Sequence, residues 1–289
     1  MLISLIVYTF SQKMSIFPVI KTTSALQTLR IYGNSKKEIT EHTYQALERA
    51  NEAGCQVCLS TGRGFAELKD YERQMDILSH GILISGGCIY DFHNQEVLSQ
   101  RTIEREFIEQ IVAAIADRDI MVQVLNQTLS VVEKSILSRM EDFYMGVYTP
   151  MYEEVTTKVE DIRDFLLHSG EDATKINLYH RSPKEREKTL QLLKDLPLSF
   201  AYSEQTSLEI TPQNIDKGAG LKFLCEKLSI SPDEVIAVGD ADNDLPILRE
   251  AGLSVAMGNA NDHVKELADV VTGDNDHDGI AEIVERYIL

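Results

Sequence analysis

Apolar and polar positions along much of the chain follow the order of strands that are each followed by a helix. A continuous apolar run over 55–60 predicts a buried strand, and the glycine-rich turn 61–64 leads from it into a helical pattern. The same order returns near the carboxyl end, where an apolar strand over 234–239 precedes a helix over 243–251. This alternation predicts an α/β fold, with a parallel sheet and helices on its faces.

The pattern changes in the middle of the chain. Apolar stretches over 120–125 and 129–132 follow one another without a helix between them, as neighbouring strands do. The chain has 289 residues, which is more than one compact core usually holds. We therefore expect two domains: a core formed by 1–87 and 208–289, and an α+β domain formed by 88–207 and inserted into that core.

The composition is that of an ordinary folded protein, with 43% hydrophobic and 26% charged residues. No apolar run approaches the roughly 18 residues of a membrane-spanning helix, so no membrane partner is expected. The net charge of −18 argues against a nucleic-acid partner, because phosphate neutralisation needs a basic surface. It leaves room for a small phosphorylated ligand, which a local cluster or a bound cation can hold. Nothing in the sequence indicates the oligomeric state.

Four cysteines in a chain of this length are too few for a disulfide scaffold. Cys55 and Cys58 form a C-x-x-C pair, but they lie inside the predicted buried strand, which favours core packing over redox chemistry. The apolar start, Met1–Phe10, has neither a basic leader nor a cleavage site with small residues, and we interpret it as a first strand. A cytoplasmic location is expected.

The most informative stretch is the polar turn that follows the strand 234–239. Asp240, Asp242 and Asp244 lie within five residues, beyond the carboxyl end of a buried strand, where open parallel sheets bind ligands. Three neighbouring carboxylates repel one another unless a cation lies between them, and an all-oxygen site suits Mg²⁺. A solvated turn that caps a helix is the alternative. The position at the strand end favours the metal site.

Two other junctions between a strand and a helix have the chemistry of anion sites. Thr61, Gly62 and Arg63 offer a hydroxyl group and backbone amides at a helix start, although a simple capping turn explains them equally well. Lys217 lies at a similar junction, where a lysine can neutralise a phosphate group. A surface lysine is the more common explanation of that position.

Taken together, these motifs resemble the haloacid dehalogenase (HAD) superfamily, and within it the Cof-type phosphatases with a large cap domain of the second class. The resemblance extends from about Asn34 to the end of the chain. It rests on the order and spacing of five motifs, Thr61-Gly-Arg63, Leu208-Glu-Ile-Thr-Pro with Asp216-Lys-Gly218, Gly239-Asp-Ala-Asp-Asn-Asp244, Ala256-Met-Gly-Asn-Ala260 and Asp278-Gly-Ile-Ala281.

The resemblance implies a Rossmann-like core, Mg²⁺ as the cofactor and a role for each matching residue. Thr61 would hydrogen-bond the transferring phosphoryl group together with Gly62 and Arg63. Lys217 would balance the charge of that group and of the nucleophile, and Asn243 would contact the phosphate. The metal would be held by Asp240, with support from Asp244 in the first or second coordination shell. The inserted domain would be a cap that selects the substrate and excludes water.

One motif of the superfamily has no match in this chain. The first motif, Asp-x-Asp-Gly-Thr, supplies the nucleophile and the general acid/base. Residues 1–37 contain five basic residues and no carboxylate. Spacing back from Asn34 places the nucleophile position near Gln27, and alignment of the apolar run 5–7 places it near Thr9. Either the chain is a degenerate phosphatase that still binds phosphate, or residues 1–33 are an out-of-frame or mis-started translation, which the abrupt charge change at Glu38 favours.

A second metal motif competes for the carboxyl end of the chain. The run from Asp274 to Gly279, together with Glu285, fits the calcium loop of an EF-hand. An EF-hand needs a helix on each side, and 270–273 instead has the pattern of a strand and a turn. The preferred hypothesis is therefore Mg²⁺-dependent hydrolysis of a small phosphomonoester, such as a sugar phosphate. A catalytically impaired protein that binds a phosphorylated metabolite is the alternative.

Overall fold

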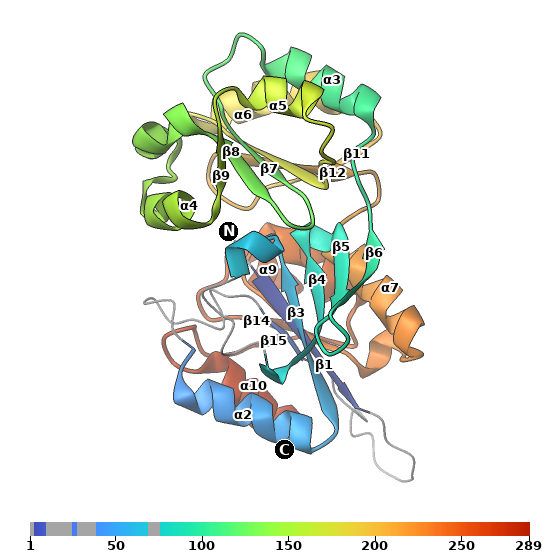
Figure 1. Cartoon of the computed structure of the whole chain (residues 1–289). Coiled ribbons are helices and arrows are strands. Elements are labelled where there is room, and N and C mark those ends of the chain that lie inside the picture. Colours follow the sequence, from blue (N-terminus) through green and yellow to red (C-terminus); the bar gives the residue numbers. More distant parts are fainter. Residues whose placement is uncertain (1–2, 10–24, 28–38, 69–75) are drawn as a thin grey trace. The chain divides into compact units, whose positions relative to one another are not determined.

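The computed structural model describes residues 3–9, 25–27, 39–68 and 76–289, which form two compact units (Figure 1). Unit 1 comprises Gln100–Ile215 and the short segment 63–68. Unit 2 comprises the described residues up to Gly62, the segment 76–99 and Asp216–Leu289. Most of the helical pattern predicted after the turn 61–64 falls on 69–75, which lies outside the described residues.

Unit 2 is built on a mixed sheet whose strands, in the described part of the chain, follow the order β15-β14-β13-β1-β3-β4-β5-β6, with β2 also paired to β3. The strands are β1 (Ile3–Thr9), β2 (Ala25–Gln27), β3 (Cys55–Thr61), β4 (Leu78–Leu83), β5 (Cys88–Asp91), β6 (Glu96–Gln100), β13 (Ile236–Gly239), β14 (Leu253–Ala256) and β15 (Val270–Val271). The pairs β3–β4, β13–β14 and β14–β15 are parallel, which confirms the predicted α/β class. The apolar start does form a strand, but β1 is antiparallel to both β3 and β13.

Two groups of helices accompany this sheet. They are α2 (Glu41–Glu52), α7 (Lys217–Leu228), α8 (Leu245–Glu250), α9 (Asp262–Leu267) and α10 (Gly279–Tyr287), with short 3-10 turns η2 (Ile84–Gly86), η5 (Pro232–Glu234) and η6 (Asp242–Asp244). Helix α2 packs against β3 and α10 (Figure 1). Helix α7 packs against α8 and η2. Thr40 caps α2, because its side chain accepts a hydrogen bond from the Thr43 amide.

Unit 1 contains a second sheet, with the strand order β11-β12-β10-β7-β8-β9. Its strands are β7 (Met121–Leu125), β8 (Ser130–Glu133), β9 (Thr157–Val159), β10 (Lys175–Tyr179), β11 (Leu198–Ala201) and β12 (Ser207–Pro212), and its helices are α3 (Arg105–Ile115), η3 (Lys134–Phe143), η4 (Gly146–Tyr148), α4 (Thr149–Val155), α5 (Ile162–His168) and α6 (Pro183–Leu193). Apolar side chains of α3, α5 and α6 form one core with alternate residues of β7, β10 and β12. A second, smaller core joins η3 and α4 to the sheet.

The boundaries between the two units differ from the expected inserted domain 88–207, because the main segment of unit 1 is Gln100–Ile215. Strands β5 and β6 extend the sheet of unit 2, because β5 pairs with β4 and β6 with β5, so 88–99 remains with that unit. Strand β12 pairs with β10 and β11 and therefore remains with unit 1. The glycine-rich segment Ser85–Gly87 joins β4 to β5 within unit 2.

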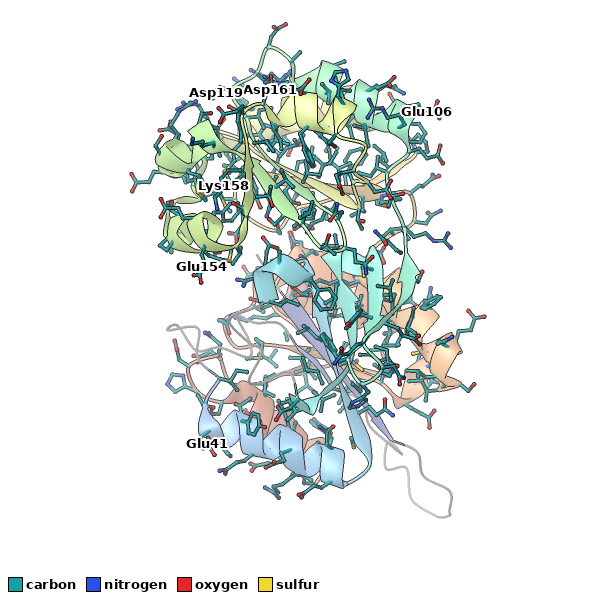
Figure 2. The ribbon with its side chains drawn as sticks, in the orientation of Figure 1. Glu41, Glu106, Asp119, Glu154, Lys158 and Asp161 are labelled. Carbon is teal, nitrogen blue, oxygen red and sulfur yellow. The ribbon has the colours of Figure 1, made fainter. Side chains whose placement is uncertain are left out.

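Several acidic side chains lie on the surface of unit 1. Glu106, Glu154 and Asp161 lie on its helices or at their ends and are exposed (Figure 2). Within the described residues, no helix has the length and apolar character needed to cross a membrane.

Candidate active site

The carboxyl ends of two strands of unit 2 place Thr61 and Asp240 at the same edge of the sheet. Strand β3 ends at Thr61, which pairs in register with Ile3 of β1. On the other side of β1, Ile6 pairs with Ala237, and continuing this register by three residues brings Asp240 beside the same Ile3. The two residues are thus two strands apart, which corresponds to about 10 Å between their backbones.

A buried ion pair joins Lys217 to the same edge. Asp216 caps α7 by accepting a hydrogen bond from the Ala219 amide at 2.8 Å, so that Lys217 occupies the first helical position. The Lys217 Nζ atom donates to Asp244 Oδ1 at 2.7 Å, and neither side chain is exposed to solvent. This pair confirms that Lys217 is not a surface lysine.

The second carboxylate oxygen of Asp244 organises the loop after β13. It accepts hydrogen bonds from the backbone amides of Asp240, at 3.0 Å, and Ala241, at 3.2 Å. One carboxylate therefore ties the start of α7 to the loop that presents Asp240. Because both oxygens of Asp244 accept from protein donors, a role in metal binding would be an indirect one.

Gly86 fits closely against the N-terminal cap of α7. Its φ angle is +96°, and a Cβ atom at this position would lie 2.1 Å from the Asp216 carbonyl oxygen. Only glycine combines this backbone conformation with so close an approach. The turn after β4 therefore supports the helix start that carries Lys217.

Replacement of Gly86 with alanine is expected to lower the free energy of unfolding by more than about 2 kcal/mol, because strain and a steric clash act together. Gly54→Ala is the matched control, since Gly54 has a φ of +86° but no heavy atom within 4 Å of the added Cβ. The control is expected to cost about 1 kcal/mol. Urea unfolding of both variants measures the difference, and equal losses would mean that the contact with Asp216 contributes nothing.

Some buried polar groups near this edge have no hydrogen-bond partner in the part of the chain that the structure describes. Both side-chain amide atoms of Asn243 are buried, and neither has a hydrogen-bond partner among the described residues. The Ser60 hydroxyl oxygen, one residue before Thr61, is also buried and has no hydrogen-bond partner among the described residues. Unsatisfied buried polar groups are costly, and a bound ligand is one of the ways in which proteins satisfy them. The sequence predicted Asn243 but gave no sign of Ser60.

The three aspartates of the loop do not converge. The Asp240 and Asp244 side chains are buried, whereas Asp242 is partly exposed and accepts a hydrogen bond from the Asn261 side chain at 3.0 Å. The His263 ring lies 3.3 Å from the same Asp242 oxygen. Among the described residues, no group of three or more His, Cys, Asp or Glu side chains has the arrangement of a metal site.

The Thr61-Gly-Arg63 motif is divided between the two units. Thr61 is fully buried at the end of β3 in unit 2. Arg63 is also buried, but it clusters with unit 1, where its Nη1 atom donates to the Glu67 carbonyl oxygen at 3.3 Å. Its expected role in phosphate binding remains a prediction.

The sheet register distinguishes the two proposed nucleophile positions. Thr9 pairs with Cys55, at the amino end of β3 and therefore at the edge away from Thr61. Gln27 of β2 pairs in parallel with Leu59, two residues before Thr61. The alignment near Thr9 is therefore wrong, because an antiparallel β1 carries its carboxyl end away from the site.

The EF-hand interpretation of the last loop is also wrong. Asp278 accepts hydrogen bonds from the hydroxyl groups of Thr40 and Thr43, while Asp274 pairs with His277 at 2.6 Å. Glu285 lies 3.3 Å from the His42 ring. The carboxylates thus face protein partners on α2 or in their own loop, and β15 takes the place of a first helix.

The C-x-x-C pair is part of the core, as predicted. Cys55 and Cys58 are buried and form no disulfide. Burial raises the pKa of the Cys58 thiol to about 12 and that of Cys55 to about 11. The thiolate that redox chemistry requires is therefore absent at neutral pH.

This sheet edge carries a buried lysine–aspartate pair and buried polar groups that lack a partner among the described residues. Such an edge is the ligand-binding edge expected in α/β enzymes. A family model described as haloacid dehalogenase-like hydrolase matches residues 32–284. The chain therefore belongs to the haloacid dehalogenase-like hydrolases, and its resemblance to the Cof-type phosphatases of that superfamily is confirmed.

Individual relatives agree with this assignment. The chain is 27% identical over 256 residues to the 5-amino-6-(5-phospho-D-ribitylamino)uracil phosphatase YitU of Bacillus subtilis, covering 87% of this chain and 92% of that protein. A haloacid dehalogenase-like hydrolase structure from Bacteroides thetaiotaomicron is 27% identical, with a TM-score of 0.72 and coverage of 90% and 95% of the two chains. A subclass IIB sugar phosphatase structure, BT4131, has a TM-score of 0.75 at 22% identity, with coverage of 90% and 95%, and shows the fold alone.

Proposed function

We propose that this protein hydrolyses a small phosphomonoester with the help of Mg²⁺. The observation that carries the proposal is the set of buried polar groups at one sheet edge of unit 2. It combines the Lys217–Asp244 pair, the unsatisfied amide of Asn243 and the strand ends at Thr61 and Asp240. A phosphate dianion offers acceptors for lysine, amide and hydroxyl donors, and a cation beside it offsets its charge.

Each residue has a defined part in this proposal. The Thr61 hydroxyl, the Gly62 amide and the Asn243 amide would donate to phosphate oxygens, with Arg63 as a further donor. Lys217 would compensate their charge while Asp244 holds its ammonium group in place. Asp240 is the buried carboxylate suited to a magnesium ligand, and Asp244 orients the loop that presents it. Bound Mg²⁺ would supply charge neutralisation at the phosphoryl oxygens.

The relatives suggest the substrate class and the role of unit 1. The Bacillus relative is named for a phosphorylated ribityl compound, and the subclass IIB structure for sugar phosphates. We propose a phosphorylated sugar or polyol derivative as substrate, and unit 1 as the cap that selects it. This assignment agrees with the separate core and sheet of unit 1.

A phosphatase assay tests the proposal with a panel of sugar and polyol phosphates and p-nitrophenyl phosphate, with and without MgCl₂. We expect turnover that requires Mg²⁺. The alternative, a protein that binds phosphorylated metabolites without turning them over, is favoured by one observation, the absence of any carboxylate before Glu38. No turnover with any substrate, together with stabilisation by inorganic phosphate in a thermal melt, would establish the alternative.

A further inference from the structure

One face of the sheet of unit 1 is polar although it is buried. Along β10, Ile176 and Leu178 face the core formed with α3, α5 and α6. The alternate residues Lys175, Asn177 and Tyr179 are fully buried as well, and they lie on the opposite face. A sheet that packed only for stability would have no need of buried polar residues on its second face, because burial of polar groups costs free energy unless each is paired.

Gln123 of β7 is the centre of a hydrogen-bond network on this polar face. Its Oε1 atom accepts from the hydroxyl groups of Tyr152, at 2.9 Å, and Tyr179, at 3.2 Å, and from Asn177 Nδ2 at 2.8 Å. Its Nε2 atom donates to Ser130 Oγ at 2.8 Å. With the oxygen directed to these three donors, Nε2 faces acceptors on the other side.

The remaining acceptor for Gln123 is a carboxylate from another part of the chain. Glu67 Oε1 accepts from Gln123 Nε2 at 2.7 Å and from the Ser130 hydroxyl at 3.3 Å. Glu67 Oε2 accepts from the Gly64 backbone amide at 3.2 Å, and the Glu67 carbonyl accepts from Arg63. Glu67 therefore forms hydrogen bonds within the segment 63–68 and also binds this segment to strands β7 and β8.

The segment held in this way begins two residues after Thr61. The chain passes from unit 2 to unit 1 between Gly62 and Arg63, so that the anchor at Glu67 lies six residues along the chain from Thr61. Gly64 is tied to the Glu67 carboxylate and Arg63 to its carbonyl, so Glu67 holds the two residues that directly follow Gly62 in the sequence.

We propose that Glu67 is a positioning residue, which couples the phosphate contacts of Thr61 and Gly62 to the buried network around Gln123. The coupling rests on the proposed function of Thr61, whereas the anchoring itself does not. Glu67 touches neither phosphate nor metal in this proposal. It acts by fixing the backbone that follows the phosphate-binding residues.

Burial of the Glu67 carboxylate has an electrostatic cost, which nearby positive charges reduce. Burial raises the pKa of Glu67, and the nearby positive charges of Arg63 and Lys175 oppose this rise. Both carboxylate oxygens of Glu67 accept hydrogen bonds, from Gly64 on one side and from Gln123 and Ser130 on the other. Lys175 in turn pairs with Glu209 at 3.4 Å within the same buried face.

Glu67→Gln tests the anchor, because it replaces one carboxylate oxygen with an NH2 group. That group must face either Gln123 Nε2 or the Gly64 amide, and since both of these are donors, one hydrogen bond is lost. Hydrogen exchange of the full-length protein, followed by mass spectrometry, measures protection of the segment 62–68. We expect exchange about tenfold faster in Glu67→Gln, as for the loss of one buried hydrogen bond to a charged group. Ser130→Ala, which removes the weaker donor, provides a milder variant should Glu67→Gln fail to fold, and it should raise exchange in the same segment.

Tyr152→Phe is the matched control. It removes a buried hydrogen bond from the same network, yet it leaves Gln123 with two donors and Glu67 with all of its contacts. Its exchange over 62–68 is expected to stay within about twofold of the original protein. Unchanged exchange in Glu67→Gln and Ser130→Ala, or an equal increase in Tyr152→Phe, would overturn the anchor.

Calorimetric titration with inorganic phosphate in MgCl₂ tests the coupling. Affinity should fall about tenfold in Glu67→Gln and remain unchanged in Tyr152→Phe. Faster exchange without any loss of phosphate affinity would overturn the coupling and leave the anchor in place. If the original protein binds no phosphate, the proposed function of Thr61 and the coupling both fail, and the exchange result still decides whether Glu67 is an anchor.

Discussion

Lys217→Met is expected to abolish phosphatase activity and to lower the free energy of unfolding by about 3–5 kcal/mol, because it leaves the buried Asp244 carboxylate without its cation. We expect kcat/KM to fall by about a thousandfold or more, since the charge proposed to compensate the phosphoryl group is lost. Urea unfolding and steady-state kinetics with p-nitrophenyl phosphate measure the two effects separately.

Lys222→Met is the control for this change. Lys222 lies on the same helix and pairs with Glu250 at 2.9 Å, but its side chain is exposed. Exposed pairs contribute little, so we expect a loss within about 1 kcal/mol and unchanged kinetics. The double variant Lys217→Met with Asp244→Leu removes both buried charges and should recover part of the stability but none of the activity. Recovery of activity in the double variant would contradict the role of Lys217 at the phosphate.

Asp240→Asn is expected to remove the response of the protein to Mg²⁺. The Asp240 side chain is buried at the end of β13, and replacement of its charge by an amide weakens binding of a hard cation. We expect turnover to fall by about a hundredfold or more. In thermal melts, MgCl₂ should raise the Tm of the original protein and leave that of Asp240→Asn unchanged.

Asp242→Asn is the matched control in the same loop. Asp242 is partly exposed and turns to Asn261 and His263 instead of the site. Its replacement should leave both turnover and the Mg²⁺-dependent rise in Tm close to those of the original protein. If the two variants lose the Mg²⁺ response equally, Asp240 has no special role as a ligand, and the proposed metal site is contradicted.

Local patterns predicted much of this molecule. Strand β3, Cys55–Thr61, extends the predicted strand 55–60 by one residue, and β13, Ile236–Gly239, lies within the predicted range 234–239. The same local patterns predicted that four site residues lie at strand ends or helix starts, namely Thr61, Lys217, Asp240 and Asn243. Such features depend on neighbours along the chain, on apolar periodicity and on capping residues, and these are visible in the sequence.

By itself, the sequence determined the α/β class, the positions of the polar turns and the resemblance to one superfamily. Only the tertiary structure decided that β1 is antiparallel, that Asp242 turns away, and that 88–99 belongs to the sheet of unit 2. It also decided the two long-range pairings, Lys217 with Asp244 and Glu67 with Gln123, which join residues 27 and 56 positions apart. Local periodicity carries no information on which distant side chains meet, because that depends on strand order and register.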